Sequence, residues 1–392
     1  MKKKVLFLSA WYPNRYDPMP GLFVKRHAET MSADFNVAVL YTHPVENFSQ
    51  HYQIESSFKN GVFTTIVYYQ KIKTKLPLFS LLLKFVRFFK AHILGFSSIK
   101  KHYGLPHFIH VNILTRVGVF ALYLKIRHGI PYVITEHWSR YNPTRNAYKG
   151  IIRKIMTNVV VKHSSGISVV SRNLKEMMQR CHIHHPHFVI TNNVVSDDFF
   201  NSPIIHSQPK PTVFIHISCF DNQAKNTVGI VRAVHKLSKQ RNDFICMMVG
   251  DGPDRLAAEE LASYLGINNN YIRFTGLKEG KELINIYNQS AFTILFSNYE
   301  NMPVVIAESF ACGKPVVSTD VGGIAEIVTT STGILVPPGN EAEFVQAINY
   351  MLNHYTEYDA QAIRNFALKQ FSAKAVARQI SALYGYNATA TP

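Results

Sequence analysis

The chain has 392 residues, of which 47% are hydrophobic and 12% aromatic, so it is globular and too long for one ordinary core; we expect two domains. Its four cysteines are scattered without a CxxC pair, which argues against a disulfide framework or a zinc site and is typical of a reducing cytosol. The net charge of +17 is unevenly distributed: residues 1–200 hold 27 Lys and Arg against 9 Asp and Glu, whereas residues 201–392 hold 15 against 16. This asymmetry predicts an anionic partner for the first half.

The first residues, MKKKVLFLSAWYPN, superficially resemble a signal peptide. Their apolar stretch is short, however, and no small-residue cleavage site follows it, so we expect a first β-strand at residues 5–10. The chain has no apolar run of 18 or more residues, and no membrane-spanning helix is expected.

Short apolar runs alternate with helix-like segments through the first half. Helix-like residues 23–31 separate the first two of these runs, which are predicted as strands at 5–10, 35–41, 108–113, 132–137 and 166–171. This alternation indicates a parallel sheet with helices on both faces.

One basic segment, KIKTKLPLFSLLLKFVRFFKAHILGF (71–96), differs from its surroundings. Lys84, Arg87 and Lys90 recur among apolar residues, so a helix there is amphipathic. It could pack on the sheet with its lysines in solvent. Since no acidic residue occurs between Glu55 and Glu136, where twelve lysines and arginines do, we favour an interfacial helix on anionic lipid.

Residues 201–211, with three prolines and no periodicity, are predicted as a linker between a domain at 1–200 and one at 212–370. In the second domain the alternation restarts, with helices expected at 228–240, 255–266 and 282–289 and strands at 212–218, 244–250, 271–276, 292–297 and 315–319. Two doubly wound units predict a cleft between them, where ligands of open α/β sheets normally bind.

The stretch ENMPVVIAE separates Glu300 from Glu308 by seven uncharged residues. It follows a predicted strand, and Pro303 suits the first position of a helix that ends at Gly313. The N–H groups of such a helix start favour a diphosphate, and a carboxylate at Glu308 could bind the two hydroxyls of a ribose. The spacing therefore fits a nucleotide-sugar, although two such glutamates are more often simply solvated.

The stretch 297–323 resembles the E-x7-E signature of the retaining glycosyltransferases of family 4, whose GT-B fold has two facing Rossmann-like domains. Nearly all of residues 1–385 resemble this family, most strongly after residue 212. The further matching segments, in the family's order, are VVSRNLKEMM (169–178), ITNNVVSDDFF (190–200), VGDGP (249–253), FTG (274–276), TDVGGIAEIV (319–328) and GILVPPGN (333–340).

The resemblance implies a role for each matching residue. Glu308 would hold the ribose, Glu300 the hydroxyls of the donor sugar, and Lys225, in CFDNQAKN (219–226), the leaving diphosphate. Further donor contacts would come from the backbone or side chains of Asn301, Met302, Pro303, Val304, Val305, Gly250, Gly276 and Leu277.

The chain departs from the family pattern at three places. Cys219 and Phe220 stand where an arginine is usual, so one cation replaces two near the diphosphate. Asn301 replaces the usual glycine after the first glutamate, and Asn193-Val194 replaces Asn-Gly. The two glutamates themselves are kept.

In the first domain, Gly21 lies in the loop after the first strand, where a glycine would let the backbone approach a phosphate or sugar. His137, at the end of a predicted strand, matches the family's active-site histidine, and His110 is a second candidate. A single histidine among eighteen is usually structural or exposed, but the end of a strand at the expected cleft favours a function for His137.

The resemblance implies a retaining, metal-independent transfer from a nucleoside-diphosphate sugar, which agrees with the lack of an Asp-x-Asp motif. The acceptor would be a glycan or lipid-linked glycan of cell-surface polysaccharide synthesis, bound by the basic half at the inner face of the cytoplasmic membrane. Residues 371–392 would include the family's last helix, which returns to the first domain.

Two alternatives remain open. A nucleotide-sugar epimerase of the same fold would share both domains but would release an epimer without an acceptor. A nucleic-acid-binding protein would account for the pI near 9.6, but the basic residues alternate with apolar runs and no nucleic-acid motif is present.

Overall fold

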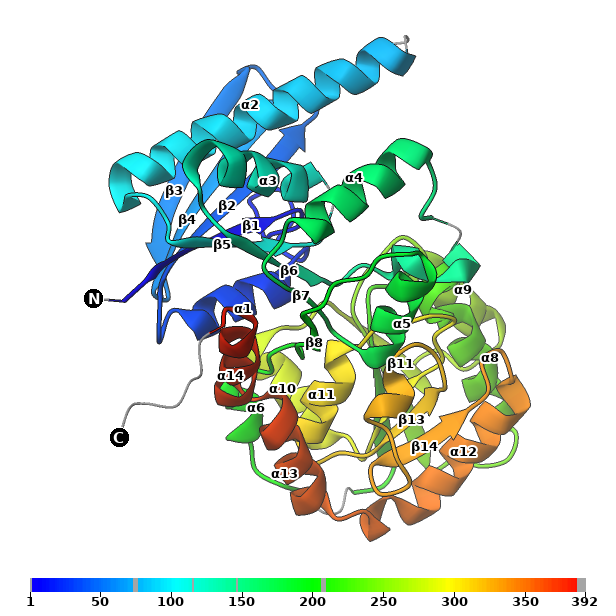
Figure 1. Cartoon of the computed structure of the whole chain (residues 1–392). Helices are drawn as coiled ribbons and strands as arrows, with labels where there is room; N and C mark the ends of the chain where they lie inside the picture. Colours follow the sequence, from blue (N-terminus) through cyan, green and yellow to red (C-terminus); the bar gives the residue numbers. More distant parts are fainter. Residues whose placement is uncertain (1, 73–76, 115, 146, 206–208, 386–392) are drawn as a thin grey trace, which may run out of the picture. The chain divides into compact units, whose positions relative to one another are not determined.

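The computed structural model (Figure 1) describes the chain except for residues 1, 73–76, 115, 146, 206–208 and 386–392. The chain forms two compact α/β units. The first comprises Met1–Val170, Lys175–Val194 and Val376–Pro392, and the second comprises Ser171–Leu174 and Val195–Ala375, in so far as these residues are described. The domain limits expected from the sequence stay predictions, and the predicted segments 71–96, 201–211 and 371–392 each include residues outside the described ones.

The sheet of the first unit has eight strands in the order β3-β4-β2-β1-β5-β6-β7-β8. Neighbouring strands are parallel except β3 and β4, an antiparallel hairpin that the sequence reasoning did not anticipate. The order reverses between β1 and β5, which makes this the topological switch point of the first unit. The strands are β1 (Lys4–Ser9), β2 (Asn36–Val45), β3 (Tyr52–Lys59), β4 (Val62–Gln70), β5 (Phe108–Asn112), β6 (Tyr132–Glu136), β7 (Ile167–Val169) and β8 (Phe188–Ile190).

Helices cover both faces of this sheet. The helices are α1 (Leu22–Met31), α2 (Pro77–Tyr103), α3 (Arg116–His128), α4 (Ile151–Lys162) and α5 (Arg172–Arg180), with short 3-10 turns at Ser139–Tyr141 and Pro143–Arg145. In Figure 1, α2, α3 and α4 lie on one face and α1 on the other. The long helix α2 packs on β2 and β4 through the buried side chains of Ala91, Phe96 and Ile99.

The second unit has a six-stranded, fully parallel sheet in the order β11-β10-β9-β12-β13-β14. Because β9 lies between β10 and β12, the order reverses at the β9–β12 pair. The strands are β9 (Thr212–Ile217), β10 (Phe244–Val249), β11 (Ile272–Gly276), β12 (Thr293–Leu295), β13 (Val316–Thr319) and β14 (Gly333–Val336).

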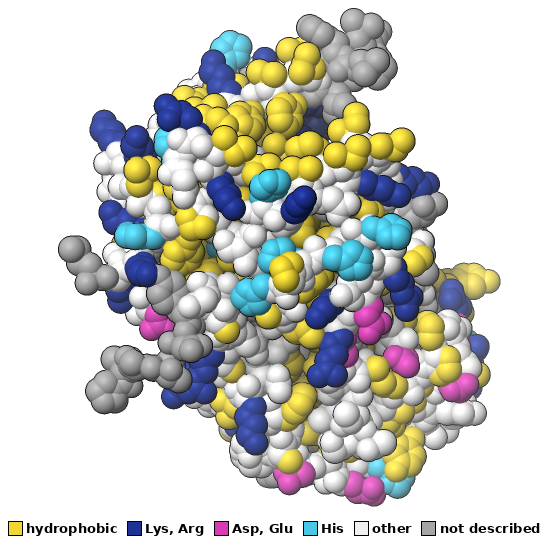
Figure 2. Space-filling view, viewed as in Figure 1, with side chains coloured by type: hydrophobic (Ala, Val, Ile, Leu, Met, Phe, Trp, Pro, Cys, Tyr) yellow, Lys and Arg dark blue, Asp and Glu magenta, His cyan; other side chains and the backbone are white. Residues whose placement is uncertain are grey.

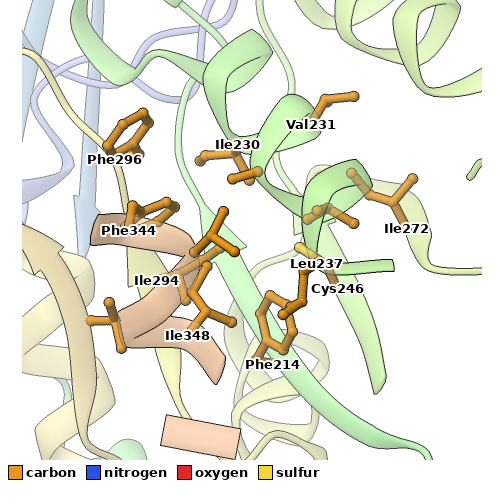
Figure 3. Packing of buried hydrophobic residues seen from close by; sticks show 14 of the residues in the cluster. Phe214, Ile230, Val231, Leu237, Cys246, Ile272, Ile294, Phe296, Phe344 and Ile348 are labelled. Atoms are coloured by element: carbon orange, nitrogen blue, oxygen red, sulfur yellow. The ribbon is translucent and has the colours of Figure 1, made fainter. Parts of the chain in front are cut away.

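The core of the second unit lies between this sheet and three helices, α8, α9 and α12. Figure 3 shows part of it, including the stacked rings of Phe296 and Phe344, whose centroids are 4.3 Å apart. The helices of this unit are α6 (Asp197–Phe200), α7 (Asn222–Lys225), α8 (Thr227–Ser238), α9 (Arg255–Tyr264), α10 (Gly280–Gln289), α11 (Val304–Ala311), α12 (Glu341–His354) and α13 (Ala360–Phe371), with 3-10 turns at Ile324–Glu326 and Tyr355–Glu357.

The last helix, α14 (Ala373–Leu383), takes the chain back into the first unit from Val376 onward. Just after it, the ring of Tyr384 packs against Phe35 and Phe108, and its hydroxyl hydrogen-bonds to Nδ1 of His110 at 2.8 Å. In the described part of the chain, no helix has the length and apolar character needed to cross a membrane.

Candidate functional site

Two residues singled out in the sequence meet at the switch point of the second sheet. Lys225 ends α7, which follows β9, and Glu300 lies in the loop after β12. Since β9 and β12 are parallel neighbours, both residues lie beyond the carboxyl ends of the strands. In open α/β sheets this is where ligands bind.

Lys225 and Glu300 form a largely buried ion pair. Nζ of Lys225 lies 2.5 Å from Oε1 of Glu300, and the Lys225 side chain is 18% exposed against 9% for that of Glu300. Burial alone lowers the pKa of Lys225, but the charge of Glu300 and the hydrogen bond to it have the opposite effect, and the pKa is raised overall. Lys225 is therefore a permanent cation at neutral pH.

The loop after β12 and the short helix α7 hold the pair in place. The backbone N–H of Asn298 donates to the carbonyl of Ala224 at 2.8 Å, and its side-chain amide donates to that of Gln223 at 3.0 Å. Ser297 Oγ donates to Oε1 of Glu300 at 2.9 Å. Asp221 caps the N-terminus of α7. Both charged side chains are thus positioned by hydrogen bonds of their immediate neighbours.

Two glycines let a third loop approach Glu300 from behind. Gly322 has φ +62°, and a Cβ there would lie 1.9 Å from the carbonyl oxygen of Glu300. The N–H of Gly323 donates to the carbonyl of Asn301 at 2.8 Å. The Gly-Gly pair after β13 therefore supports the backbone that carries Glu300.

Helix α11 starts one residue later than the sequence indicates. Pro303 is the N-cap, with ψ 122° outside the helical range, and Val304 is the first helical residue; the placement of Pro303 at the first helical position is therefore corrected. Pro303 makes no side-chain cap bond at this end of the helix, and the N–H of Ile306 donates to the Pro303 carbonyl at 3.2 Å. Around this turn Met302 and Pro303 are buried, and Asn301, Val304 and Val305 are half-buried.

Glu308, in the second turn of α11, is only 4% exposed. The hydroxyl of Tyr287, from α10, donates to the carbonyl of Val305 at 3.0 Å and lies 3.5 Å from Oε2 of Glu308. Glu308 therefore places a nearly buried carboxylate in the second turn of α11, and its oxygens can accept hydrogen bonds from hydroxyls of a ligand.

Gly250, Gly276 and Leu277 lie at the carboxyl ends of β10 and β11, along the same sheet edge. The N–H of Gly250 donates to the carbonyl of Gly276 at 2.9 Å. Gly250 has φ +130°, and a Cβ there would lie 1.9 Å from the carbonyl oxygen of Ser218 after β9. Leu277 is 45% exposed and leaves an apolar side chain at this edge.

In the first unit, Gly21 lies close to the backbone of Trp11, and this contact within the unit requires a glycine there. Gly21 has φ +73° and caps α1, and a Cβ there would lie 2.2 Å from the carbonyl oxygen of Trp11. His110 is fully buried, and both its ring nitrogens are occupied, by Tyr384 and by Thr135 at 2.6 Å. The structure therefore gives His110 a role in holding β5, β6 and the C-terminal segment together.

His137 directly follows β6 and is 9% exposed. Its ring lies against Phe23 at 4.3 Å and His27 at 5.6 Å, both from α1. Burial lowers the pKa of His137 well below its ordinary value, and the neighbouring His27 and His110 lower it further. Its imidazole is therefore neutral at physiological pH.

The residue before it, Glu136, was missed by the sequence reasoning. Its carboxylate is fully buried and accepts the backbone N–H groups of His137 and Trp138, each at 2.9 Å. It also accepts hydrogen bonds from the N–H of Leu114, the hydroxyl of Tyr141 and the guanidinium of Arg140. This carboxylate organises the loop that carries His137. An acidic residue in an otherwise acid-free stretch was the available signal.

Among the residues that the structure describes, no group of three or more His, Cys, Asp or Glu side chains is placed to hold a metal ion.

Comparisons with known proteins agree with this arrangement. The family model "Glycosyltransferase Family 4" matches residues 23–199, and the model "Glycosyl transferases group 1" matches residues 197–369. An uncharacterised glycosyltransferase of Methanocaldococcus jannaschii is 24% identical over 262 residues, 66% of each chain. The matches to the next three curated relatives span only 40–45% of their lengths.

Solved structures share the fold over almost the whole chain. Sucrose-phosphate synthase of Thermosynechococcus elongatus superposes with a TM-score of 0.76 at 18% identity and covers 98% of both chains. HepE of Anabaena, solved with UDP and glucose, gives 0.72 at 16% identity, over 98% of this chain and 100% of that one.

The two Rossmann-like units have the GT-B fold, which confirms the fold class expected from the sequence. With one family model on each half, the chain belongs to the group 1 glycosyltransferases of family 4.

Proposed function

We propose that the chain transfers a sugar, with retention of anomeric configuration, from a nucleoside-diphosphate sugar to a glycan or lipid-linked glycan. The observation that carries this proposal is the buried Lys225–Glu300 pair beside the uncapped start of α11, at the switch point of the second sheet. A diphosphate next to sugar hydroxyls satisfies both partners of this pair. The phosphates attract Lys225 and the helix N–H groups, and the hydroxyls donate to Glu300.

The other donor contacts follow from the same edge. We assign the ribose hydroxyls to Glu308, because it is the second glutamate of the E-x7-E pattern and its carboxylate oxygens can accept hydrogen bonds from two neighbouring hydroxyls. The nucleobase then lies toward the ends of β10 and β11, near Gly250, Gly276 and the exposed Leu277. The Anabaena neighbour, solved with UDP and with UDP-glucose, supports a donor of this chemical class.

The transfer breaks the bond between the anomeric carbon and a diphosphate oxygen, and a bond to the acceptor oxygen forms on the same face of the sugar. Lys225 and the start of α11 stabilise the negative charge that develops on the diphosphate. The departing diphosphate oxygen takes the proton of the acceptor hydroxyl. His137 is neutral and can both donate and accept a hydrogen bond, and we predict that it contributes to this step. We expect the reaction to need no divalent metal.

We also propose that the first unit binds an anionic membrane surface on its cytoplasmic side, where the acceptor would be presented. Leu82, Phe85, Val86 and Ile93 of α2 are 38–59% exposed, and Ile151, Ile152 and Ile155 of α4 are 55–78% exposed. Figure 2 shows hydrophobic side chains gathered over α2 with Lys and Arg around them.

The charge of this surface supports the same partner. Residues 77–162, which span α2, α3 and α4, contain one acidic residue, Glu136, and it is fully buried. The exposed Lys84 and Lys90 each contribute roughly 1 kcal/mol next to anionic lipid.

Four free cysteines are consistent with a reducing compartment.

The deciding experiment measures the binding of UDP-, GDP- and ADP-sugars to the purified protein by calorimetry. We expect one nucleotide class to bind, and Glu308→Ala to weaken it at least tenfold. Glu282→Ala serves as the control, because its side chain on α10 of the same unit is 70% exposed. If no nucleotide-sugar binds, or if Glu308→Ala binds as tightly as the control, the proposed donor site is wrong.

Retention and metal independence are tested on the product. NMR of the glycosidic linkage should give the donor's anomeric configuration, and a chelator should leave the rate unchanged. An epimer released without acceptor would identify the epimerase alternative instead.

A further inference from the structure

The only two tryptophans of the chain lie together in the first unit. Trp11 follows β1 and Trp138 follows β6, so both lie at the carboxyl edge of the first sheet, close to its β1–β5 switch point. Their ring centroids are 5.1 Å apart, with the planes at 62° in an edge-to-face arrangement. More than a hundred residues of sequence separate them, so the fold brings them together.

Both rings are only half-buried. In the described part of the chain, neither indole N–H makes a hydrogen bond. Neither is among the fully buried polar atoms that lack a partner. A buried indole N–H usually finds an acceptor. These two donors instead remain available at the surface, next to two aromatic rings.

The ring of Trp138 is held rigidly. Its backbone N–H donates to the buried carboxylate of Glu136, and the guanidinium of Arg140 lies 4.2 Å from the centroid of its ring. Arg140 in turn hydrogen-bonds to Glu136 at 3.3 Å. The conformation of this side chain is therefore fixed by a buried ion pair.

Trp11 is fixed from its backbone. Its backbone N–H donates to Oγ of Ser9 at 3.2 Å, and the Ser9 hydroxyl donates to the carbonyl of Trp11. Gly21 packs against the same carbonyl. Two aromatic rings on rigid loops form a preorganised surface, which loses little entropy when a ligand binds.

We propose that the Trp11–Trp138 pair binds a pyranose ring of the acceptor; this inference rests on the proposed function. The C–H groups on one face of a pyranose carry partial positive charge and are attracted to the negative face of an indole. Its hydroxyls accept hydrogen bonds from the free indole N–H groups. An acyl or isoprenoid chain would use the rings but not these donors, and we therefore assign the pair to the sugar portion of the acceptor.

The test uses the tryptophan fluorescence of the whole chain, excited at a wavelength where its 20 tyrosines absorb little, so that the emission comes from this pair. The protein is titrated with methyl glycosides and disaccharides of glucose, galactose, mannose and N-acetylglucosamine. We expect a saturable change in emission with at least one of these sugars. If no sugar changes the emission while a nucleotide-sugar binds in calorimetry, the inference is overturned and the proposed donor site stands.

Variants separate stacking from loop structure, with affinities measured by calorimetry. We expect Trp138→Ala to weaken the sugar at least tenfold, and Trp138→Phe, which keeps a ring but removes the N–H, to weaken it less. Tyr264→Ala, an 87% exposed aromatic residue of the second unit, should have no effect. Both Trp138 variants should keep their affinity for the nucleotide-sugar. Equal sugar affinity in Trp138→Ala and the unmodified protein would also overturn the inference.

Discussion

At the scale of single residues, the carboxylate of Glu136 accepts five hydrogen bonds within the first unit. It is fully buried, and Arg140, its partner in the ion pair, is 3% exposed. Removing one partner of a buried pair leaves the other charge without compensation. Glu136 therefore determines both the stability of the first unit and the conformation of the loop with His137 and Trp138.

We predict that Glu136→Gln lowers the free energy of unfolding of the first unit by about 3–5 kcal/mol. Urea unfolding followed by tryptophan fluorescence measures this directly, because both tryptophans lie in that unit. The control is Glu55→Gln, which breaks an ion pair with Arg15 whose side chains are 37% and 40% exposed. That change should cost less than about 1 kcal/mol. Similar losses in the two variants would contradict the prediction.

A second prediction concerns Gly322. Gly322→Ala should weaken nucleotide-sugar binding at least tenfold, because its new methyl group would displace the Glu300 carbonyl, 1.9 Å away. Gly339→Ala is a matched control: its φ of +76° is similarly left-handed, but nothing lies within 4 Å of the added atom. Because an alanine disfavours this left-handed backbone, Gly339→Ala should lower the free energy of unfolding by about 1–2 kcal/mol. It should leave the affinity for the nucleotide-sugar unchanged. Equal affinities for the two variants would show that the support of Glu300 is dispensable.

The candidate site could be predicted from sequence only where a local pattern carries it. Lys225, Glu300 and Glu308 lie in recognisable segments. Asn298 and Gly322, by contrast, matter because of contacts across the fold, with the carbonyls of Ala224 and Glu300. No local spacing encodes such a contact, and the same holds for the pairing of Trp11 with Trp138.

At the scale of elements, most strands and helices follow from the alternation of apolar runs, and the exceptions have physical reasons. The β3–β4 hairpin was missed because β3 is largely exposed and lacks an apolar run. Its signal was the turn Asn60-Gly61, with φ of 51° and 76°, a dipeptide typical of two-residue hairpins. Pro303 lies before α11 rather than inside it, and either position is compatible with its missing N–H.

Helix α2 carries the third prediction. Val86→Glu places a negative charge on a side chain that is 50% exposed in the apolar surface of α2. We expect binding to phosphatidylglycerol vesicles, measured by sedimentation, to fall at least tenfold. Leu256→Glu, at a 65% exposed position of α9 in the second unit, should leave vesicle binding unchanged. Vesicle binding by Val86→Glu equal to that of this control would argue that α2 has another partner.

At the scale of the whole molecule, buried histidines are concentrated in the first unit. Four of them, His27, His92, His110 and His137, lie in that unit, and His216 lies in the second, among the described residues. Burial lowers the pKa of His27, His92 and His216 to about 4 and that of His110 to about 3. The unfolded chain, with pKa values near the ordinary 6.5, therefore binds more protons than the folded one in this range.

Stability is consequently lost as the pH falls from about 6.5 toward 4, and each such histidine contributes about 1.4 kcal/mol per pH unit. We predict that the first unit unfolds in acid before the second, so tryptophan fluorescence changes at a higher pH than the loss of total helix signal in circular dichroism. His92→Phe should weaken the pH dependence of unfolding that is followed by tryptophan fluorescence, whereas His216→Phe should leave it unchanged. Coincident acid transitions of the two signals would contradict this.

The return of the chain at α14 has a consequence for the order in which the molecule is built. The second unit lies wholly within residues 171–375, whereas the first needs residues from both ends of the described chain, with Tyr384 packed against Phe35 and Phe108. During synthesis, the half that leaves the ribosome first is therefore the last to be completed. Until α14 and Tyr384 have been synthesised, the apolar surface of Phe35 and Phe108 stays uncovered, and partly folded species that expose such surface are prone to aggregate.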